Sequence, residues 1–296
     1  MANLRDIRNR IESVKNTRQI TKAMKMVAAA KLRKAQDRII ATRPYAGKMK
    51  EIVARLVTDA SEEYQLLREP ETTDKVLLII ISSDRGLCGA FNNNLFKMVE
   101  KTIEKDYLEY KKEGTLSLAC VGRKAIKHFG KRNYNIVAEY PNFFDEVKFP
   151  KVSAIMRKVI GQFNDGVYDE VKLAYNEFKS VIAQNRIVES VLPIEPESLV
   201  NKEEEVAKQR EYIYEPNVDE ILKKLLPSHL NLQFWKAVLE SNAAEQGARM
   251  TAMDNATENA NELQEDLELE YNRARQSAIT TEISEIISGA QALEDT

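Results

Sequence analysis

Helix breakers are confined to the middle of this chain, and their distribution constrains its fold more than any other feature of the sequence. Neither proline nor glycine occurs in residues 1–43, and Gly247 is the only one of either type in residues 228–288. Seven of the ten glycines fall within residues 86–166, and seven of the eight prolines fall within residues 70–227. Because both residue types disfavour the interior of a helix, the pattern predicts a long helix at each end of the chain and a differently folded middle.

Both terminal runs carry a stripe of apolar and small residues at the three- and four-residue steps of a helix. In the first run the stripe comprises Leu4, Ile7, Ile11, Val14, Thr21, Ala28, Leu32, Ala35 and Ile39. In the second run it comprises Ala256, Ala260, Leu263, Leu267, Tyr271, Ala274 and Ala278, followed by Ile279, Ile283, Ile286, Ala290 and Leu293. A repeat kept over this length is typical of a coiled coil, and we expect an antiparallel one because both helices belong to one chain.

Two details of composition refine the predicted coil. Ala248, Ala252, Ala256 and Ala260 form a row of small residues that lets another helix approach closely. Pro44 and Gly47 are expected to interrupt the first helix before it ends near Asp59. A narrow rod therefore follows from the sequence, and rods serve mechanical or scaffolding roles more often than catalysis.

The two terminal runs carry opposite charge, although the whole chain is nearly neutral at −2. Residues 1–57 hold fifteen Lys or Arg and four Asp or Glu, a formal charge of +11. Residues 237–296 hold three Lys or Arg and thirteen Asp or Glu, a formal charge of −10. Opposite charge favours the pairing of the two helices with each other.

The lengths of the two runs predict that one helix extends beyond the other. At 1.5 Å per residue the first run spans roughly 85 Å, and the second, from about Asn217 to Ala290, spans roughly 110 Å. If their lower ends are level, the C-terminal helix extends past its partner by about 25 Å. That extension carries Ile279, Ile283, Ile286 and Ile287, so we expect an external partner to cover these apolar side chains.

The middle of the chain alternates between strand and helix patterns. We expect strands at 76–82, 116–121, 136–139, 171–178 and 187–193, and helices at 92–112, 123–131 and 153–163. This alternation predicts an α/β body, Rossmann-like, with a mostly parallel sheet covered by helices. The predicted organisation is an N-terminal coiled-coil helix at 1–60, the body at 70–200, a charged connector at 201–216 and a C-terminal coiled-coil helix at 217–296.

The loop at residues 82–89, SSDRGLCG, follows the first predicted strand and precedes a helix, which is where phosphates bind in many α/β proteins. It matches neither the G-x-G-x-x-G pattern of dinucleotide sites nor the G-x-x-x-x-G-K-[ST] pattern of a P-loop. Gly86 and Gly89 are as well explained by a tight turn, and we favour that structural interpretation. A nucleotide-dependent enzyme that uses the loop from Asp84 to Gly89 is the alternative.

A row of basic residues, Lys15, Arg18, Lys22 and Lys25, lies beside the apolar stripe of the first helix. Basic residues interleaved with aromatic ones are typical of nucleic-acid sites, but few aromatic residues interleave with this row. The acidic helix of the same chain is also available to pair with it. A solvated face, or one that faces an acidic protein ring, is the better interpretation. A nucleic-acid or adaptor module is the remaining alternative.

No set of side chains indicates catalysis, a cofactor or a metal. His128 and His229 are isolated, and Cys88 and Cys120 lack the spacing of metal ligands, so we expect reduced thiols in a cytoplasmic compartment. Met24, Met26, Met250 and Met253 are expected to fill gaps in the core. Trp235 is expected to anchor the C-terminal helix to the body.

No segment approaches the ~20 apolar residues of a membrane-spanning helix, and the N-terminus lacks the apolar segment of a secretory signal.

Four stretches of the chain resemble one protein family closely. They are residues 11–31 (IESVKNTRQITKAMKMVAAAK), 83–92 (SDRGLCGAFN), 248–260 (ARMTAMDNATENA) and 271–290 (YNRARQSAITTEISEIISGA). With these motifs the chain resembles the γ subunit of a bacterial F-type ATP synthase, over its whole length and in the same order. Each motif is long enough to be specific by itself.

The resemblance implies a function as a central rotor shaft without catalytic sites of its own. In this family the coiled coil threads the α₃β₃ ring of α and β subunits, which carry the nucleotide sites. The body and the lower coil sit on the membrane c-ring with the ε subunit, and proton flow turns the c-ring and the shaft together. The implied location is the cytoplasmic face of the cell inner membrane, as a peripheral protein, with no nucleic acid as partner.

The resemblance also implies the residues that meet the stator. Met24 and Lys25 match the stretch that meets the acidic lever of the β subunit. Positions that contact the β-subunit catch region are matched by Arg249, Arg275, Gln276, Thr280 and Glu282. The side chains of Ile279, Ile283, Ile286 and Ile287 would form an apolar bearing inside a sleeve of the ring. Chloroplast members insert a cysteine-bearing regulatory segment, and because Cys88 and Cys120 lie elsewhere, we expect no thiol switch.

Overall fold

The computed structural model describes residues 4–58, 64–68, 70, 72–195 and 214–294. Most of the predicted connector at 201–216 lies outside these residues. The chain divides into two compact units, one formed by residues 1–28 with 250–296 and the other by residues 29–249. We refer to the first as the coil unit and to the second as the body unit. The two terminal helices contribute to both.

The two long terminal helices are present as predicted. Helix α1 spans Leu4–Thr58 and helix α7 spans Val218–Glu294. The expected interruption at Pro44 and Gly47 is wrong, because α1 continues through both residues. Pro44 is exposed, whereas Met49, Val53 and Leu56 on the following turns are buried in the core of the body unit. Packing of those turns offsets the one backbone hydrogen bond that a proline removes from a helix.

The body unit is built on one five-stranded sheet in the order β3-β2-β1-β4-β5. The strands are β1 (Val76–Ile81), β2 (Leu116–Val121), β3 (Asn135–Tyr140), β4 (Glu170–Phe178) and β5 (Gln184–Leu192). The first four are parallel, and β5 returns antiparallel beside β4. This arrangement confirms the predicted mostly parallel sheet.

Short helices connect the strands of the sheet. They are α2 (Phe91–Asp106), α3 (Leu108–Glu113), α4 (Arg123–Phe129) and α5 (Phe149–Asn164), with a 3-10 turn η2 at Phe143–Asp145. A second 3-10 turn, η1 (Gln65–Leu67), precedes β1. The prediction of a single helix at 92–112 is wrong, because the helix is divided at Tyr107. Tyr107 is buried, and its hydroxyl lies 3.0 Å from Glu170 Oε2 on β4. That tertiary contact is not visible in the local helix pattern.

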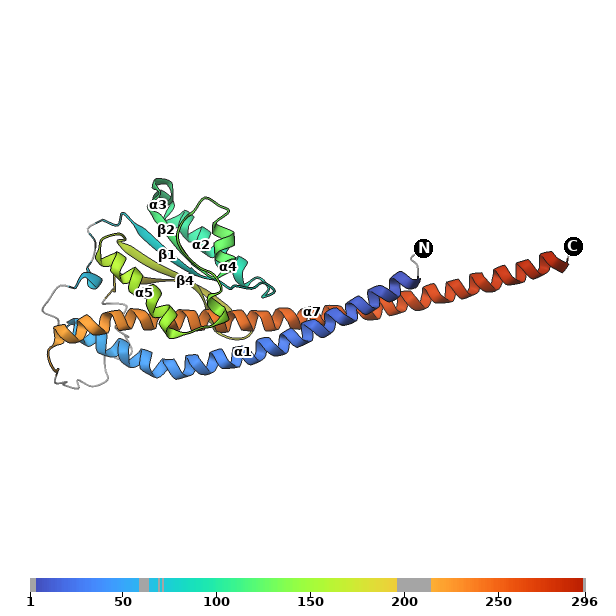
Figure 1. Cartoon of the computed structure of the whole chain (residues 1–296), viewed down its shortest axis with the longest axis horizontal. Helices are drawn as coiled ribbons and strands as arrows, with labels where there is room; N and C mark the ends of the chain where they lie inside the picture. The colour runs from blue at the N-terminus through green and yellow to red at the C-terminus, as the bar shows by residue number, and fades with distance from the viewer. Residues whose placement is uncertain (1–3, 59–63, 69, 71, 196–213, 295–296) are drawn as a thin grey trace. The chain divides into compact units, whose positions relative to one another are not determined.

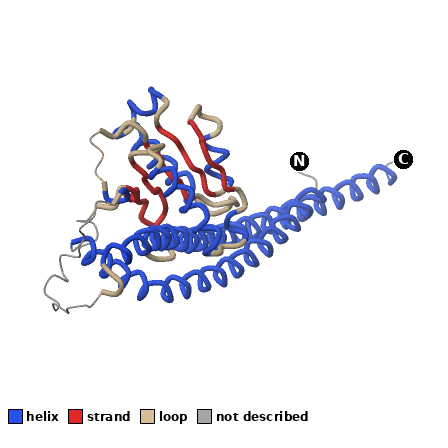
Figure 2. Tube along the Cα trace, turned by 60° about the vertical axis from the view of Figure 1, so that its left-hand side comes forward, coloured by secondary structure: helices blue, strands red, loops and turns tan. Residues whose placement is uncertain are grey.

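Alternate residues of each strand point to opposite faces of the sheet, as the pleat requires. On β1, Leu77, Ile79 and Ile81 pack with α5, α1 and α7 on one face. Val76, Leu78 and Ile80 pack with α2 and α4 on the other face. The sheet of the body unit is therefore buried on both sides by helices, and Figure 2 shows its strands lying between them.

Within the body unit, α1 and α7 pack against each other and against the sheet. Leu32, Ala35 and Ile39 of α1 form one buried cluster with Leu239 and Ala243 of α7. Trp235 contacts Phe149 edge to face, with ring centroids 5.7 Å apart, and the neighbouring Phe234 is fully buried. The predicted anchoring role of Trp235 agrees with this placement.

The coil unit is an antiparallel pair of helices. Arg18 Nη1 donates to Asn261 Oδ1 at 3.1 Å, and Thr257 Oγ1 donates to Thr21 Oγ1 at 2.8 Å. Lys25 pairs with Asp254. Residue numbers rise along α1 while they fall along α7, which establishes the direction.

Two side chains of the coil unit differ from the sequence prediction. Leu263 is 49% exposed, whereas Ala260 and Leu267 are buried, so the seam steps over Leu263. Met26 is 61% exposed and does not fill a core gap, whereas Met253 is buried. In both cases a one-residue choice of register on a helix moves a side chain by about 100° around the axis.

Candidate functional site

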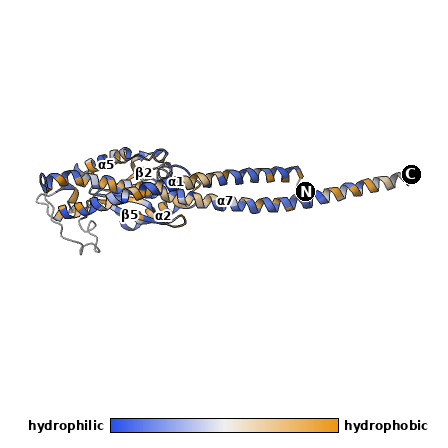
Figure 3. Ribbon diagram, turned by 90° about the horizontal axis from the view of Figure 1, so that it is seen from below, coloured by the Kyte–Doolittle hydropathy of each residue, from blue (hydrophilic) through white to orange (hydrophobic). Residues whose placement is uncertain are grey.

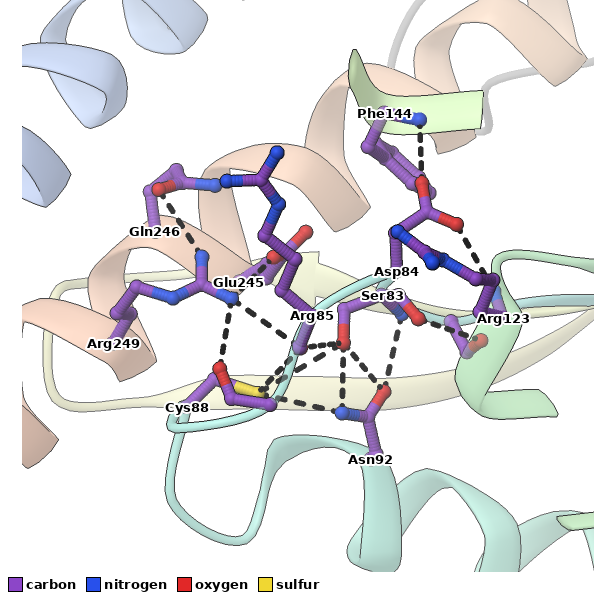
Figure 4. A network of polar contacts seen from close by, with 12 residues as sticks. Ser83, Asp84, Arg85, Cys88, Asn92, Arg123, Phe144, Glu245, Gln246 and Arg249 are labelled. Atoms are coloured by element: carbon purple, nitrogen blue, oxygen red, sulfur yellow. Dashed lines mark hydrogen bonds and ion pairs between the residues drawn. The ribbon is translucent and has the colours of Figure 1, made fainter. Parts of the chain in front are cut away.

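The loop after β1 is a polar site in the body unit, and it is held closed by the chain itself. Asp84 is buried, and its carboxylate accepts hydrogen bonds from the backbone N–H groups of Arg123, Asn142 and Phe144 at 3.0, 2.8 and 2.8 Å (Figure 4). A side-chain carboxylate thus takes the backbone donors that a bound anion would otherwise use.

Serine and asparagine side chains fix the rest of this loop. Ser82 Oγ accepts from Ala125 N–H at 2.9 Å in the first turn of α4. Ser83 N–H and the Ser83 hydroxyl both lie 3.1 Å from Asn92 Oδ1 at the start of α2. Gly122, with φ of 93°, leaves no room for a side chain, since a Cβ there would lie 2.3 Å from Ser82 O. The favoured tight-turn interpretation of the loop agrees with this geometry.

Helix α7 fills the crevice where open α/β sheets bind their ligands. That crevice lies beyond the carboxyl ends of β1 and β4, between which the strand order reverses. Ser241 of α7 donates to Ile81 O at 3.5 Å, and Glu240 accepts from Phe178 N–H at 3.2 Å. Ala244 of α7 packs with Cys88 and Phe91. The ligand crevice is therefore occupied by the protein's own helix, which disfavours a nucleotide-dependent enzyme.

Arg249 joins α7 to the β1–α2 loop. Its guanidinium pairs with Glu245 Oε1 at 2.7 Å and donates to the carbonyl oxygens of Gly86 at 3.2 Å and Arg85 at 3.4 Å. Figure 4 shows Arg249 pointing from α7 toward this loop. The side chains of Arg249 and Glu245 are only 11% and 5% exposed. Of the predicted stator contacts, Arg249 is thus bound inside the chain.

Burial shifts the titration of two groups beside Arg249. Desolvation raises the pKa of Glu245 above the usual carboxylate value, and the Arg249 charge lowers it in part. Desolvation also raises the pKa of the Cys88 thiol, again opposed by Arg249. Arg249 is therefore the charge that keeps this buried corner of the body unit compensated.

The other predicted stator contacts lie in the coil unit. Met24 and Lys25 are half-buried on α1, and Lys25 pairs with Asp254. Arg275, Gln276, Thr280 and Glu282 are exposed on α7, and Thr280 Oγ1 donates to Gln276 O at 2.9 Å. The structure does not gather the predicted set into one site. It places the residues at separate levels of the long helices.

The C-terminal part of α7 has no partner among the described residues of the coil unit. Every side chain from residue 275 to 290 is exposed, a length of roughly 24 Å at 1.5 Å per residue. Ile279, Ile283, Ile286 and Ile287 are 48%, 52%, 66% and 57% exposed. Figure 3 shows hydrophobic residues along this segment, which Figure 1 shows continuing past the start of α1. The predicted uncovered apolar segment is present, at close to the predicted length.

His128 and two residues of the basic row are bound by other residues of the chain. His128 Nε2 lies 2.8 Å from Glu100 Oε1, and its ring stacks on Phe96 at 4.3 Å. Arg18 and Lys25 of the basic row are engaged by α7, whereas Lys15 and Lys22 are exposed. Half of the row thus serves the pairing of the helices, which weakens the nucleic-acid alternative.

Sequence reasoning missed a cavity of about 560 Å³ in the body unit. It is lined by residues of α1, of β4, β5 and the turn after β5, and of α7, among them Arg43, Lys50, His229 and Glu240. Desolvation, together with the nearby Lys50 charge, lowers the pKa of His229, and desolvation raises that of Glu240. Because the lining comes from three distant segments, no local motif indicates it.

Neither a membrane span nor a metal cluster is found in the part of the chain that the structure describes. None of the described helices combines the length and the apolar character needed to cross a membrane. The described residues contain no group of three or more His, Cys, Asp or Glu that could hold a metal ion.

Fold and site together define a class of protein: an α/β body whose ligand crevice is closed by its own C-terminal helix, with that helix continuing into an antiparallel coil. The ATP synthase family model matches residues 3–293. The ATP synthase gamma chain of Salinibacter ruber is 50% identical over 100% of this chain and 99% of its own length. That of Chloroherpeton thalassium is 49% identical over 99% of both. The chain belongs to the ATP synthase gamma chain family.

Solved structures are similar over most of the chain. A chain of the central stalk and c-ring of Tetrahymena thermophila mitochondrial ATP synthase has a TM-score of 0.59 and 27% identity, covering 80% of this chain and 99% of its own length. A chain of the Euglena gracilis mitochondrial enzyme has a TM-score of 0.67 over 98% of this chain and 94% of its own length. At 23% identity, that second likeness concerns the fold alone.

Proposed function

We propose that the chain is the central rotor shaft of a proton-translocating ATP synthase and is not catalytic by itself. The observation that carries this proposal is the segment 275–290 of α7, which is helical, uncovered and apolar along one side. We expect such a segment to be covered by a surrounding partner whose contacts still allow the helix to rotate. Membership of the gamma chain family supports the same assignment.

The proposed bearing uses non-directional contacts. Ile279, Ile283, Ile286 and Ile287 would turn inside an apolar sleeve of the α₃β₃ ring, where burial of apolar surface favours insertion. Because the hydrophobic effect does not depend on the direction of approach, contacts made by these isoleucines change little as the shaft rotates. The tip would thereby be held on the axis without being locked.

The proposed rotor–stator contacts lie outside that bearing. Met24 and Lys25 would meet an acidic segment of a β subunit, and Arg275, Gln276, Thr280 and Glu282 would meet its catch region. Charged pairs of this kind are modest when exposed to water, typically below about 1 kcal/mol each. Attraction that is modest and depends on orientation would favour some rotary angles while leaving rotation possible.

The proposed assembly places the body on the membrane side. In this proposal residues 1–60 and 217–296 make the shaft, and residues 70–200 form the body that carries it. The body and the lower coil would contact the c-ring and the ε subunit at the cytoplasmic face of the cell membrane, as a peripheral component. Proton flow through the membrane part would turn the c-ring, and the shaft would turn with it.

Co-purification tests the proposal most directly. The tagged full-length chain, expressed from its own cells, should bring down α and β subunits, and a map of that complex should place residues 275–290 on the axis of the ring. A map with this segment on the outside of the ring would overturn the proposal.

Calorimetric titration of the isolated chain with ATP and NAD should give no heat of binding. Micromolar binding would instead favour the enzyme alternative.

A further inference from the structure

We propose that Arg249 is an internal latch that positions α7 against the β1–α2 loop where α7 leaves the body unit. The family resemblance assigns Arg249 to a contact with a partner chain. The latch is a different role for the same side chain. It concerns the body unit alone and does not depend on the rotor assignment.

The guanidinium of Arg249 has four acceptors within its own chain, three of them on Nη2 and one on Nη1. It bonds Glu245 Oε1 at 2.7 Å and Gln246 Oε1 at 3.3 Å on α7. Across the junction it bonds the carbonyl oxygens of Arg85 and Gly86. A lysine ammonium would end one bond short of Nη2, the nitrogen that contacts Glu245 and both carbonyls, and it would have no second nitrogen for Gln246. To reach a partner chain, Arg249 would first have to leave these four acceptors.

Glu245 makes the latch distinguishable from a stator contact. Its side chain is 5% exposed, and its Oε2 atom is buried without a hydrogen-bond partner among the described residues. Glu245 therefore cannot touch another protein, yet it supplies the shortest of the four contacts to Arg249. A change at Glu245 should disturb a latch and leave a surface contact intact.

The loop that receives Arg249 is rigid enough to serve as a fixed support. Asp84 ties it to three backbone N–H groups, and Ser83 ties it to Asn92 (Figure 4). Leu87, with φ of 62°, and Gly89, with φ of 59°, complete the turn. Two carbonyl oxygens are thereby presented side by side to one guanidinium, which fixes α7 both along and around its axis at this point.

Cys88 reports whether the latch is closed. Its side chain is 1% exposed and packs beneath Ala244 of α7. Cys120 is the only other cysteine of the chain, and it is fully buried in β2 on the opposite face of the sheet from α7. Opening of the latch should uncover Cys88 alone, whereas unfolding of the body should uncover both thiols.

Thiol labelling of the full-length chain with a small maleimide, with peptides quantified by mass spectrometry, tests the latch. In Arg249→Ala and in Glu245→Gln we expect Cys88 to react about tenfold faster or more, the scale set by loss of one charge-assisted hydrogen bond. Cys120 should keep its wild-type rate. Loss of the Arg249 charge disfavours the Cys88 thiolate in the first variant, so an acceleration there would understate the opening. Loss of the Glu245 charge favours the thiolate in the second variant, so Arg249→Ala is the stricter test of the two.

Two further variants keep the test decisive. Arg249→Lys retains the charge and should accelerate Cys88 by less than Arg249→Ala, because a lysine can pair with Glu245 but ends one bond short of Nη2, which contacts both carbonyls. Arg273→Ala, an exposed arginine of the same helix, should leave both thiols at their wild-type rates. An unchanged Cys88 rate in both Arg249→Ala and Glu245→Gln would overturn the proposal. Equal acceleration of Cys88 and Cys120 in the milder Glu245→Gln and Arg249→Lys variants would overturn it as well.

Discussion

Two largely buried charged side chains, Asp84 and Arg249, bind groups of their own chain at the loop that resembles a ligand site in the sequence. Asp84 satisfies three backbone donors at the edge where a phosphate would bind, and Arg249 compensates a buried glutamate beside the same loop. Both charges face inward, toward groups of their own chain. At the residue scale, the features that look like a ligand site in the sequence are devices that hold the fold together.

Replacing Asp84 should destabilise the body unit far more than replacing a nearby surface aspartate. Asp84→Asn keeps the size of the side chain but loses the charge that strengthens three hydrogen bonds, so we expect a loss of about 2–4 kcal/mol in the free energy of unfolding. Asp145→Asn, which breaks an exposed pair with Arg85, should cost less than about 1 kcal/mol. Urea denaturation followed by circular dichroism compares the two. Equal losses would contradict the inward role of Asp84.

The stability penalty of Arg249→Ala should grow with pH. Burial raises the folded-state pKa of Glu245 above its reference value of 4.5, and Arg249 opposes that rise. Without Arg249 the folded-state pKa rises further, so the folded state binds the proton more tightly than the unfolded state does. Stability then falls as pH rises from about 4.5 through the folded-state pKa. The unfolding free energies of variant and wild type should differ more at pH 8 than at pH 5, and a constant difference would refute this linkage.

At the scale of elements, the coil shows that a helix pattern alone does not determine which apolar residues are buried between the two helices. Both Leu263 and Leu267 fit a three- or four-residue step, but only Leu267 is buried. The sequence could predict the helices, the strands and the antiparallel pairing, since each follows from period and breakers. It could not predict the division of the 92–112 helix at Tyr107 or the closing of the crevice by α7. Those features depend on contacts between residues far apart in the chain, such as Tyr107 with Glu170 and Ser241 with Ile81.

The two leucines therefore give a matched test of the coil register. Leu267→Ala removes a buried side chain from the seam and should lower the free energy of unfolding by about 2–3 kcal/mol. Leu263→Ala removes an exposed one and should change it by less than about 0.5 kcal/mol. Thermal and urea unfolding of the full chain, followed by the helical signal, measure both. A larger effect at Leu263 would mean that the seam has the other register.

At the scale of the whole molecule, charge serves two purposes that a variant can separate. The basic α1 and the acidic α7 attract each other, and Lys25 pairs with Asp254 in the coil unit. The proposed function gives Lys25 a second partner, on an acidic stator. A single reversal at Lys25 would disturb both, so the two roles need a paired substitution.

Lys25→Glu should impair coupling in the assembled enzyme more than it impairs assembly, measured as ATP-driven proton pumping relative to ATP hydrolysis and to yield of complex. Combining Lys25→Glu with Asp254→Lys restores an opposite-charge pair between the helices but leaves the charge on α1 inverted. If Lys25 acts on a stator, the double variant should stay impaired. Full recovery in the double variant would assign the role of Lys25 to helix pairing alone.

The covering of the crevice by α7 has a consequence for how the protein is made. Ser241 and Ile81, which meet there, are separated by 160 residues. A ribosome releases all five strands, through Leu192, before it releases the helix segment that covers Phe178, Cys88 and Phe91. The nascent sheet therefore waits with an apolar edge uncovered until the C-terminal helix emerges, and a non-local closing step of this kind is slow relative to local folding. Truncated products of synthesis would keep that edge exposed, which makes them natural clients for chaperones and proteases.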